Sequence, residues 1–161
     1  MMRETEVLEL QSETLDQIYA HAKVEFPDEC CGIILSDETQ EFVRECRNIQ
    51  NERHAEDPDT YPRNARTAYL IDPNDLIRVH KESETKDRPI KAFYHSHPNH
   101  DAYFSEKDKA DATAWDEPVY PGAAYVVVSV YDREVKTTKA FAWNEDDTDF
   151  VEVPIHAKRD A

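Results

Sequence analysis

Two histidines at the end of an expected strand restrict how this chain can fold. Residues 89–94 (PIKAFY) are short, apolar-leaning and rich in aromatic side chains, which predicts a strand. His95 and His97 follow directly. Because residues i and i+2 of a strand point to the same face of a sheet, both imidazoles are expected to face one point. The fold must therefore leave room for two converging imidazoles at the end of this strand.

A carboxylate follows at a spacing that suits the same point. Residues 105–115 have the pattern of a helix that opens at Ser105, and Asp108 lies one turn further along the same helix face. Two imidazoles, one carboxylate and a water are the usual ligands of a catalytic zinc ion. The sequence therefore predicts a zinc site, one ion per chain, with His95, His97 and Asp108 as ligands.

Structural explanations exist for part of this pattern. Ser-x-x-Asp at a helix start is close to a capping box, so Ser105 can serve as a helix cap. Asp108 can serve as a first-turn acid that interacts favourably with the helix dipole. Ser105 can both cap the helix and serve the site through different atoms, and capping does not account for the two histidines beside them.

Other metal or nucleophile chemistries fit the chain less well. The sequence lacks the His-Glu-x-x-His motif of zincins. His54-Ala55-Glu56 matches the first half of a nucleobase deaminase signature, but the Pro-Cys-x-x-Cys that must follow is absent, so His54 and Glu56 are interpreted as loop residues. Cys30 and Cys31 lie in an apolar run, where thiols are usually inert.

The remaining pattern predicts an α/β fold, a mixed β-sheet flanked by helices, in a single domain spanning residues 1–161 with a core from about 6 to 154. Residues 48–66 are expected to form a long loop that closes over an extended substrate. A polar tail is expected after residue 153. Strands are predicted at 6–10, 30–35, 41–47, 68–71, 123–131, 135–143 and 150–153, the last as an edge strand. A tight turn at 132–134 is expected to join two of them as a hairpin, and Gly32 is expected to mark a close backbone approach. Further helices are predicted from a capped start at Ser12 to before Pro27 and from Asp72-Pro73 to about Thr85.

Composition limits the partners. A formal net charge of −16 over 161 residues argues against nucleic acid and against anionic membranes, both of which require a basic surface. No run of 18 apolar residues is present and the first six residues do not resemble a signal peptide, so a cytoplasmic protein is expected. Three clustered cysteines, Cys30, Cys31 and Cys46, are expected to be buried and reduced.

The combined motifs resemble a known family. His95, His97, Ser105 and Asp108 form the pattern His-x-His-x(7)-Ser-x-x-Asp, which is similar to the signature of the JAMM (MPN-type) zinc metalloproteases. The segment 26–35 (FPDECCGIIL) also resembles the family's upstream segment, in which a glutamate precedes Cys-Gly and an apolar strand. The resemblance covers most of the chain, from about Leu15 to Trp143, and is strongest to the small single-domain prokaryotic branch, although Phe104 stands where that branch often has proline.

This resemblance implies a cytidine-deaminase-like fold and hydrolysis of peptide or isopeptide bonds. The implied substrates are adducts at the C-terminal glycine of ubiquitin-like or sulfur-carrier proteins that end in Gly-Gly. It implies that Glu29 is the general base, which composition alone does not single out, and that Ser105 stabilises the oxyanion. His100 and Asp101 lie between the ligands and are candidates for supporting contacts.

Two alternatives remain open at this point. A non-catalytic MPN-type scaffold would only bind partners, although such scaffolds generally lack the ligand set that is complete here. The other alternative is an enzyme of the same type that releases an amino acid from a sulfur-carrier adduct in cysteine or cofactor biosynthesis. The sequence does not predict the oligomeric state.

Overall fold

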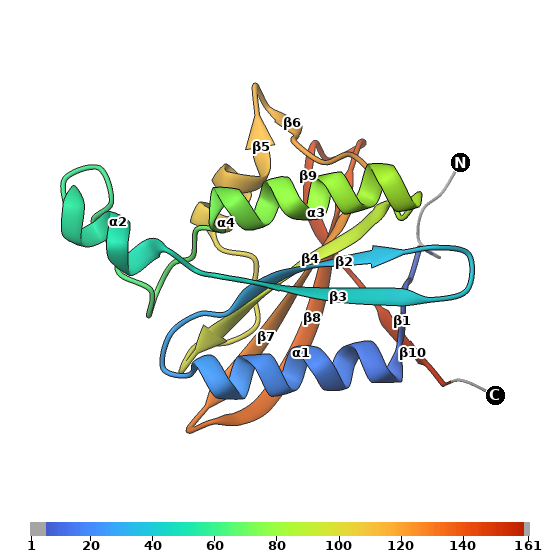
Figure 1. Ribbon diagram of the computed structural model, residues 1–161, viewed down its shortest axis with the longest axis horizontal. Coiled ribbons are helices and arrows are strands. Elements are labelled where there is room, and N and C mark those ends of the chain that lie inside the picture. The colour runs from blue at the N-terminus through green and yellow to red at the C-terminus, as the bar shows by residue number, and fades with distance from the viewer. Residues whose placement is uncertain (1–5, 160–161) are drawn as a thin grey trace.

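A six-stranded mixed sheet forms the centre of the computed structural model, which describes residues 6–159 (Figure 1). Residues 1–5, on which the expectation of no signal peptide partly rests, lie outside the described residues. The strand order is β3-β2-β4-β7-β8-β9, with β4 and β7 parallel and the other neighbours antiparallel. The strands of this sheet are β2 (Cys31–Ser36), β3 (Glu41–Cys46), β4 (Ile90–Pro98), β7 (Ala124–Tyr131), β8 (Glu134–Asn144) and β9 (Asp149–Val153).

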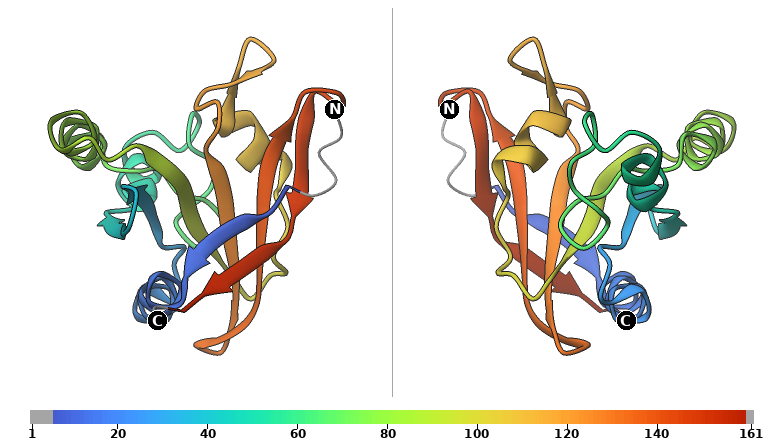
Figure 2. Two further views of the ribbon diagram at one scale, coloured as in Figure 1. Left: turned by 90° about the vertical axis from the view of Figure 1, so that its right-hand side faces the viewer. Right: turned by 90° about the vertical axis from the view of Figure 1, so that its left-hand side faces the viewer.

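Helices cover both faces of this sheet, as Figure 2 shows. Outside the sheet, the elements are β1 (Leu8–Gln11), α1 (Ser12–Glu25), α2 (Gln50–Glu56), α3 (Pro73–Lys86), α4 (Glu106–Ala112), β5 (Thr113–Ala114), β6 (Glu117–Pro118) and β10 (Ile155–Lys158). The inner strands β2, β4 and β7 are buried on both faces, which explains their nearly continuous apolar sequences. The predicted mixed sheet flanked by helices is therefore confirmed.

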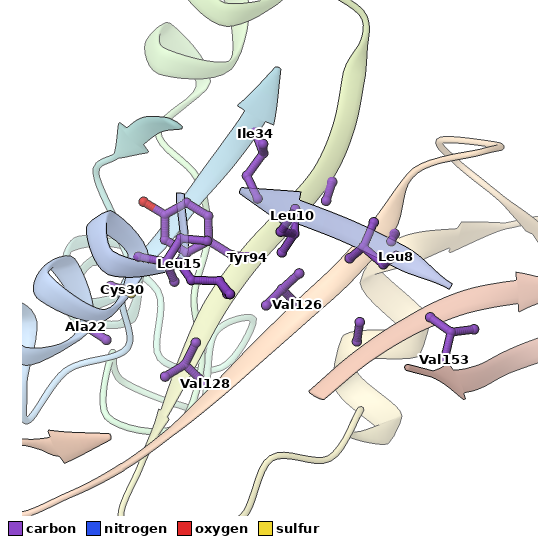
Figure 3. Close-up of a cluster of buried hydrophobic side chains, with 14 of the residues drawn as sticks. Leu8, Leu10, Leu15, Ala22, Cys30, Ile34, Tyr94, Val126, Val128 and Val153 are labelled. Carbon is purple, nitrogen blue, oxygen red and sulfur yellow. The ribbon is translucent and has the colours of Figure 1, made fainter. Parts of the chain in front are cut away.

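Two apolar clusters lie on opposite faces of the sheet. The first packs α1 against β4 and β7 and includes Leu15, Tyr94 and Val126 (Figure 3). The second packs α3 and α4 against the other face, where Phe93 and its neighbours lie. Because side chains alternate along a strand, consecutive residues of β4 enter different clusters.

The predicted close backbone approach at Gly32 is confirmed. Gly32 of β2 lies opposite Tyr94 of β4, and a Cβ atom at Gly32 would overlap the Tyr94 ring. That ring is almost fully buried, and its hydroxyl lies 2.7 Å from Nδ1 of His21 on α1. The absence of a side chain at residue 32 therefore allows Tyr94 to bridge the sheet and α1.

Several local predictions are confirmed. The Asp72 side chain caps α3 by accepting a hydrogen bond from the Asn74 backbone N–H. The turn between β7 and β8 is tight, with positive φ at Asp132 and Arg133, as hairpin turns with the twist of the strands require. The three cysteines are buried and free, and β9 forms an edge of the main sheet.

Two predicted irregular segments are in fact structured. The expected loop at 48–66 contains α2, which projects from the body of the molecule beside the sheet (Figure 1). The expected polar tail contains β10, which pairs in parallel with β1. Both depend on partners distant in sequence, which local patterns do not reveal.

Other boundaries also differ from the prediction. Residues 68–71 form no strand, and only an isolated bridge joins Ile71 to Asn48. Ser12 does not cap α1, because its hydroxyl donates to the Lys158 carbonyl of β10 instead. Helix α4 ends at Ala112 rather than at Trp115, because the chain turns there into the short β5–β6 hairpin.

None of the helices within residues 6–159 combines the length and the apolar character that crossing a bilayer requires.

The contact between Gly32 and Tyr94 generates a stability prediction. Gly32→Ala should lower the free energy of unfolding by about 1–3 kcal/mol, the usual cost of overpacking a dense core. Urea denaturation measures this change. In a Tyr94→Leu background, which removes the overlapping ring atoms, the same substitution should be nearly neutral, and an equal loss in both backgrounds would contradict the proposed overlap.

Candidate metal centre

Three ligand atoms meet in a buried triangle. Nε2 of His95 lies 3.2 Å from Nε2 of His97, and Oδ2 of Asp108 lies 3.2 and 3.3 Å from these two atoms. All three side chains are buried. Tetrahedral zinc ligands at their usual bond lengths lie about 3.3 Å from one another. The three residues therefore fit a tetrahedral divalent cation that leaves one position for another ligand.

The strand pairing positions the two imidazoles. His95 and His97 lie opposite Val127 and Ser129 of β7, so both side chains project from the sheet face that α3 and α4 cover. The Nδ1 atom of His97 lies 2.8 Å from the Asp101 carbonyl oxygen. A carbonyl only accepts, so Nδ1 carries the proton and Nε2 presents its lone pair to the site.

His100 and Asp101, the candidates for supporting contacts, lie in the turn beside the site. Asp101 orients His97 through its backbone carbonyl. His100 contacts the Pro98 carbonyl through its own ring, and its carbonyl accepts a hydrogen bond from the Ser129 hydroxyl. Both residues therefore hold the turn that follows β4.

A stacked aromatic ring orients His95. The rings of Tyr69 and His95 are stacked, with their centroids 4.5 Å apart. Nδ1 of His95 is buried without a hydrogen-bond partner among the described residues, so stacking is what fixes the plane of this ring. Sequence analysis missed Tyr69, because it lies in a segment predicted to be a strand and carries no recognisable motif.

Asp108 belongs to a capping box as well as to the triangle. The Asp108 N–H donates to Oγ of Ser105, and the Ser105 N–H donates to Oδ2 of Asp108, both at 3.0 Å. Burial alone would raise the pKa of Asp108, but the two imidazoles beside it and the Ser105 N–H outweigh burial and hold that pKa well below its usual range. Asp108 is therefore a carboxylate available to a cation.

Glu29 faces the same space from the neighbouring strand. The antiparallel register of β2 and β4 pairs Cys31 with His95, and continued towards the N-terminus it places Glu29 across from His97. Glu29 is buried, and burial followed by the nearby Asp108 charge raises its pKa well above the ordinary value. A carboxylate with a raised pKa is a stronger base than an exposed one, which suits a group that accepts a proton and later returns it.

Ser105 completes the group at the helix start. It lines a pocket of about 310 Å³ together with Glu29, His97 and Asp108. Its oxygen accepts a hydrogen bond from the Asp108 N–H, which leaves its hydroxyl proton free to donate into the pocket. The structure thus brings together all five residues that the sequence indicated.

Amide side chains from the segment before and within α2 hold Glu29 in place. Asn48 donates from Nδ2 to the Glu29 carbonyl at 2.9 Å, and the Glu29 N–H donates to the Ala65 carbonyl at 2.7 Å. Gln50 and Asn51 fasten the returning chain through bonds to Arg63 O and Ala65 N. Sequence analysis missed this frame, because the segment resembles a polar loop.

Two curated proteins are similar to this chain over most of their length. The CysO-cysteine peptidase of Mycobacterium tuberculosis is 31% identical over 126 residues, which cover 78% of this chain and 75% of the relative. The desampylase of Haloferax volcanii is 28% identical over 126 residues, covering 76% of this chain and 80% of the relative.

Solved structures with little sequence identity share the fold. A protein from Desulfitobacterium hafniense aligns with a TM-score of 0.69 at 21% identity, covering 95% of this chain and 94% of that one. A JAB1/MPN domain protein from Archaeoglobus fulgidus aligns with a TM-score of 0.50 at 15% identity, covering 94% and 100%.

A family model extends the agreement to the whole site. The model described as prokaryotic homologs of the JAB domain matches residues 11–145, a range that holds Glu29, His95, His97, Ser105 and Asp108. The match includes the five strands β2, β3, β4, β7 and β8 of the main sheet and the helices α1, α2, α3 and α4, but not the edge strand β9. The resemblance predicted from the motifs is confirmed, and the chain belongs to the family of prokaryotic homologues of the JAB domain.

Proposed function

We propose that this protein is a zinc-dependent hydrolase that cleaves the amide bond formed by the C-terminal glycine of a ubiquitin-like or sulfur-carrier protein. The observation that carries the proposal is the buried triangle of His95, His97 and Asp108 with Glu29 facing the same pocket. The names of two relatives, a CysO-cysteine peptidase and a desampylase, support this substrate class. A non-catalytic scaffold would have no use for these buried polar groups, which are costly to bury without a cation.

The chain supplies three ligands for one zinc ion. His95 and His97 contribute neutral imidazoles through Nε2, and Asp108 contributes Oδ2. When bound, a zinc ion in such a site lowers the pKa of a water molecule towards neutrality and polarises the substrate carbonyl.

Glu29 moves the proton. Its carboxylate accepts a proton from the attacking water and later delivers it to the leaving amine, so the C–N bond breaks and the carbonyl carbon gains the hydroxyl. Burial and the fixed backbone of Glu29 suit this exchange, because they keep the carboxyl close to the pocket with a raised pKa.

Ser105 donates a hydrogen bond to the oxyanion that forms when water adds to the carbonyl. Its oxygen is already oriented by the Asp108 N–H, so the hydroxyl needs little reorganisation during the reaction.

The ubiquitin-like or sulfur-carrier protein of the substrate would end in Gly-Gly, and two glycines without side chains are narrow enough to enter a pocket of about 310 Å³. We further propose that the protein acts in the cytoplasm, since three free buried thiols suit a reducing compartment.

Metal content gives the first test. Purified protein should contain about one zinc ion per chain, and His97→Ala should lose it, because two ligands rarely hold zinc with useful affinity. Elemental analysis by mass spectrometry measures both. His156→Ala, at an exposed histidine on β10, should keep its zinc. A folded wild type that takes up no zinc would contradict the site.

The proposed base gives the second test. Glu29→Gln should retain zinc but slow cleavage of a sulfur-carrier–cysteine adduct by at least about 10²-fold, since an amide cannot accept the proton. Mass spectrometry of the carrier follows the reaction. Glu25→Gln, at an exposed acid on α1, serves as the control. Wild-type turnover in Glu29→Gln would remove Glu29 from this role.

The proposed oxyanion donor gives the third test. Ser105→Ala should lower kcat by about 10²–10³-fold. It should also cost about 1 kcal/mol of stability through the lost cap. Ser105→Thr keeps both the hydroxyl and the cap and should retain most activity. Steady-state kinetics with thermal unfolding separates the two effects, and an unchanged kcat in a destabilised Ser105→Ala would show that the residue only caps.

A further inference from the structure

A cationic side chain stands beside the proposed base without a carboxylate partner. Arg63 lines the pocket that Glu29, His97 and Ser105 also line. Within the described residues, Arg63 is the only lysine or arginine on this pocket, and it forms no salt bridge there. Its guanidinium makes one hydrogen bond, from Nη1 to the Thr67 carbonyl at 3.3 Å. Most of its donors therefore remain available.

The backbone of Arg63 is fixed relative to Glu29. Gln50, which is almost fully buried, donates from Nε2 to the Arg63 carbonyl at 2.9 Å. Two residues further on, the Ala65 carbonyl accepts the Glu29 N–H. The hydrogen-bonded backbone therefore fixes the position from which the Arg63 side chain extends, and this side chain is exposed at the edge of the pocket.

The charged groups around Arg63 are mostly acidic or already paired. Glu29 and Asp108 give the pocket two carboxyl groups, and the whole chain carries a formal charge of −16. The nearby Lys107 is paired with Asp111 at 2.7 Å, so its charge is already compensated. Among the described side chains that line the pocket, Arg63 is therefore the cation that can pair with an entering anionic group, and its planar guanidinium binds carboxylates through two parallel hydrogen bonds.

We propose that Arg63 binds the α-carboxylate of the residue that leaves, so that the preferred substrate is a carrier protein extended by a single amino acid with a free carboxylate. This inference rests on the proposed function. In such an adduct the carboxylate is attached to the carbon next to the scissile nitrogen. In a lysine isopeptide, the corresponding carboxyl lies at the far end of the side chain and is an uncharged amide of the target protein. Arg63 therefore discriminates between the two kinds of adduct.

The test compares two substrates that differ only in this charge. A sulfur-carrier protein ending in Gly-Gly is extended by one alanine, as the free acid or as the carboxamide. The zinc-loaded wild type should cleave the acid with a KM about tenfold lower than the amide, the usual effect of a hydrogen-bonded charge. Arg63→Ala should raise KM for the acid about tenfold at a similar kcat and leave the amide unchanged, and Arg63→Lys should restore part of the preference.

Matched controls separate the possible failures. Arg66→Ala, on the same exposed segment but away from the pocket, should behave as wild type on both substrates. Calorimetry with the Glu29→Gln protein should show that it binds the acid form of the alanine-extended carrier about tenfold more tightly than the carboxamide. The Glu29→Gln/Arg63→Ala double variant should bind both forms equally. Equal cleavage of acid and amide by wild type, or a loss in Arg63→Ala that is the same for both, overturns the role of Arg63 alone. A wild type that cleaves neither overturns the proposed function.

Discussion

The architecture of the site depends on the crossover that joins two parallel strands. β4 and β7 are neighbours in the sheet, and parallel neighbours need a connection that leaves one end of the sheet and returns to the other. That connection carries α4, whose first turn comes back over the C-terminal end of β4. Oδ2 of Asp108 there accepts the Ser105 N–H and lies within 3.3 Å of both histidine rings. A buried carboxylate is costly unless it is paired, so the placement of Asp108 beside two imidazoles favours a cation at this point of the crossover.

The second half of the site is built by the segment around α2. This helix is short and polar and projects from the body, so its own packing contributes little to its stability. What secures it is a set of amide side chains, since Asn48, Gln50 and Asn51 all donate to or accept from the backbone of the chain around Glu29 and Ala65. Hydrogen bonds of this kind fix geometry more than they add free energy. The segment around α2 therefore fixes the backbone positions of Glu29 and Arg63.

The sequence predicted the parts of the fold that local physics controls. Periodic apolar runs identified the inner strands, and the Asp72 cap and the hairpin at Asp132 have local signatures that were correctly interpreted. The spacing of His95 and His97 predicted that their imidazoles converge, because alternation along a strand is a local rule. The predictions failed where distant partners decide, as for α2 and β10. Glu29 lies between these cases, since the antiparallel register that places it opposite His97 is not visible in its own neighbourhood.

The register of β4 shows how the apolar core enforces the chemistry. Tyr94 and Ser96 point to the α1 face, where the Tyr94 hydroxyl contacts His21 and Oγ of Ser96 accepts the Cys30 N–H at 2.8 Å. The residues that alternate with them, His95 and His97, must then point to the other face. A slip of one residue would place both imidazoles in the apolar cluster under α1 and Tyr94 in the site. The buried contacts of Tyr94 therefore do more than stabilise the sheet, because they disfavour the register in which the two imidazoles and Asp108 would not meet.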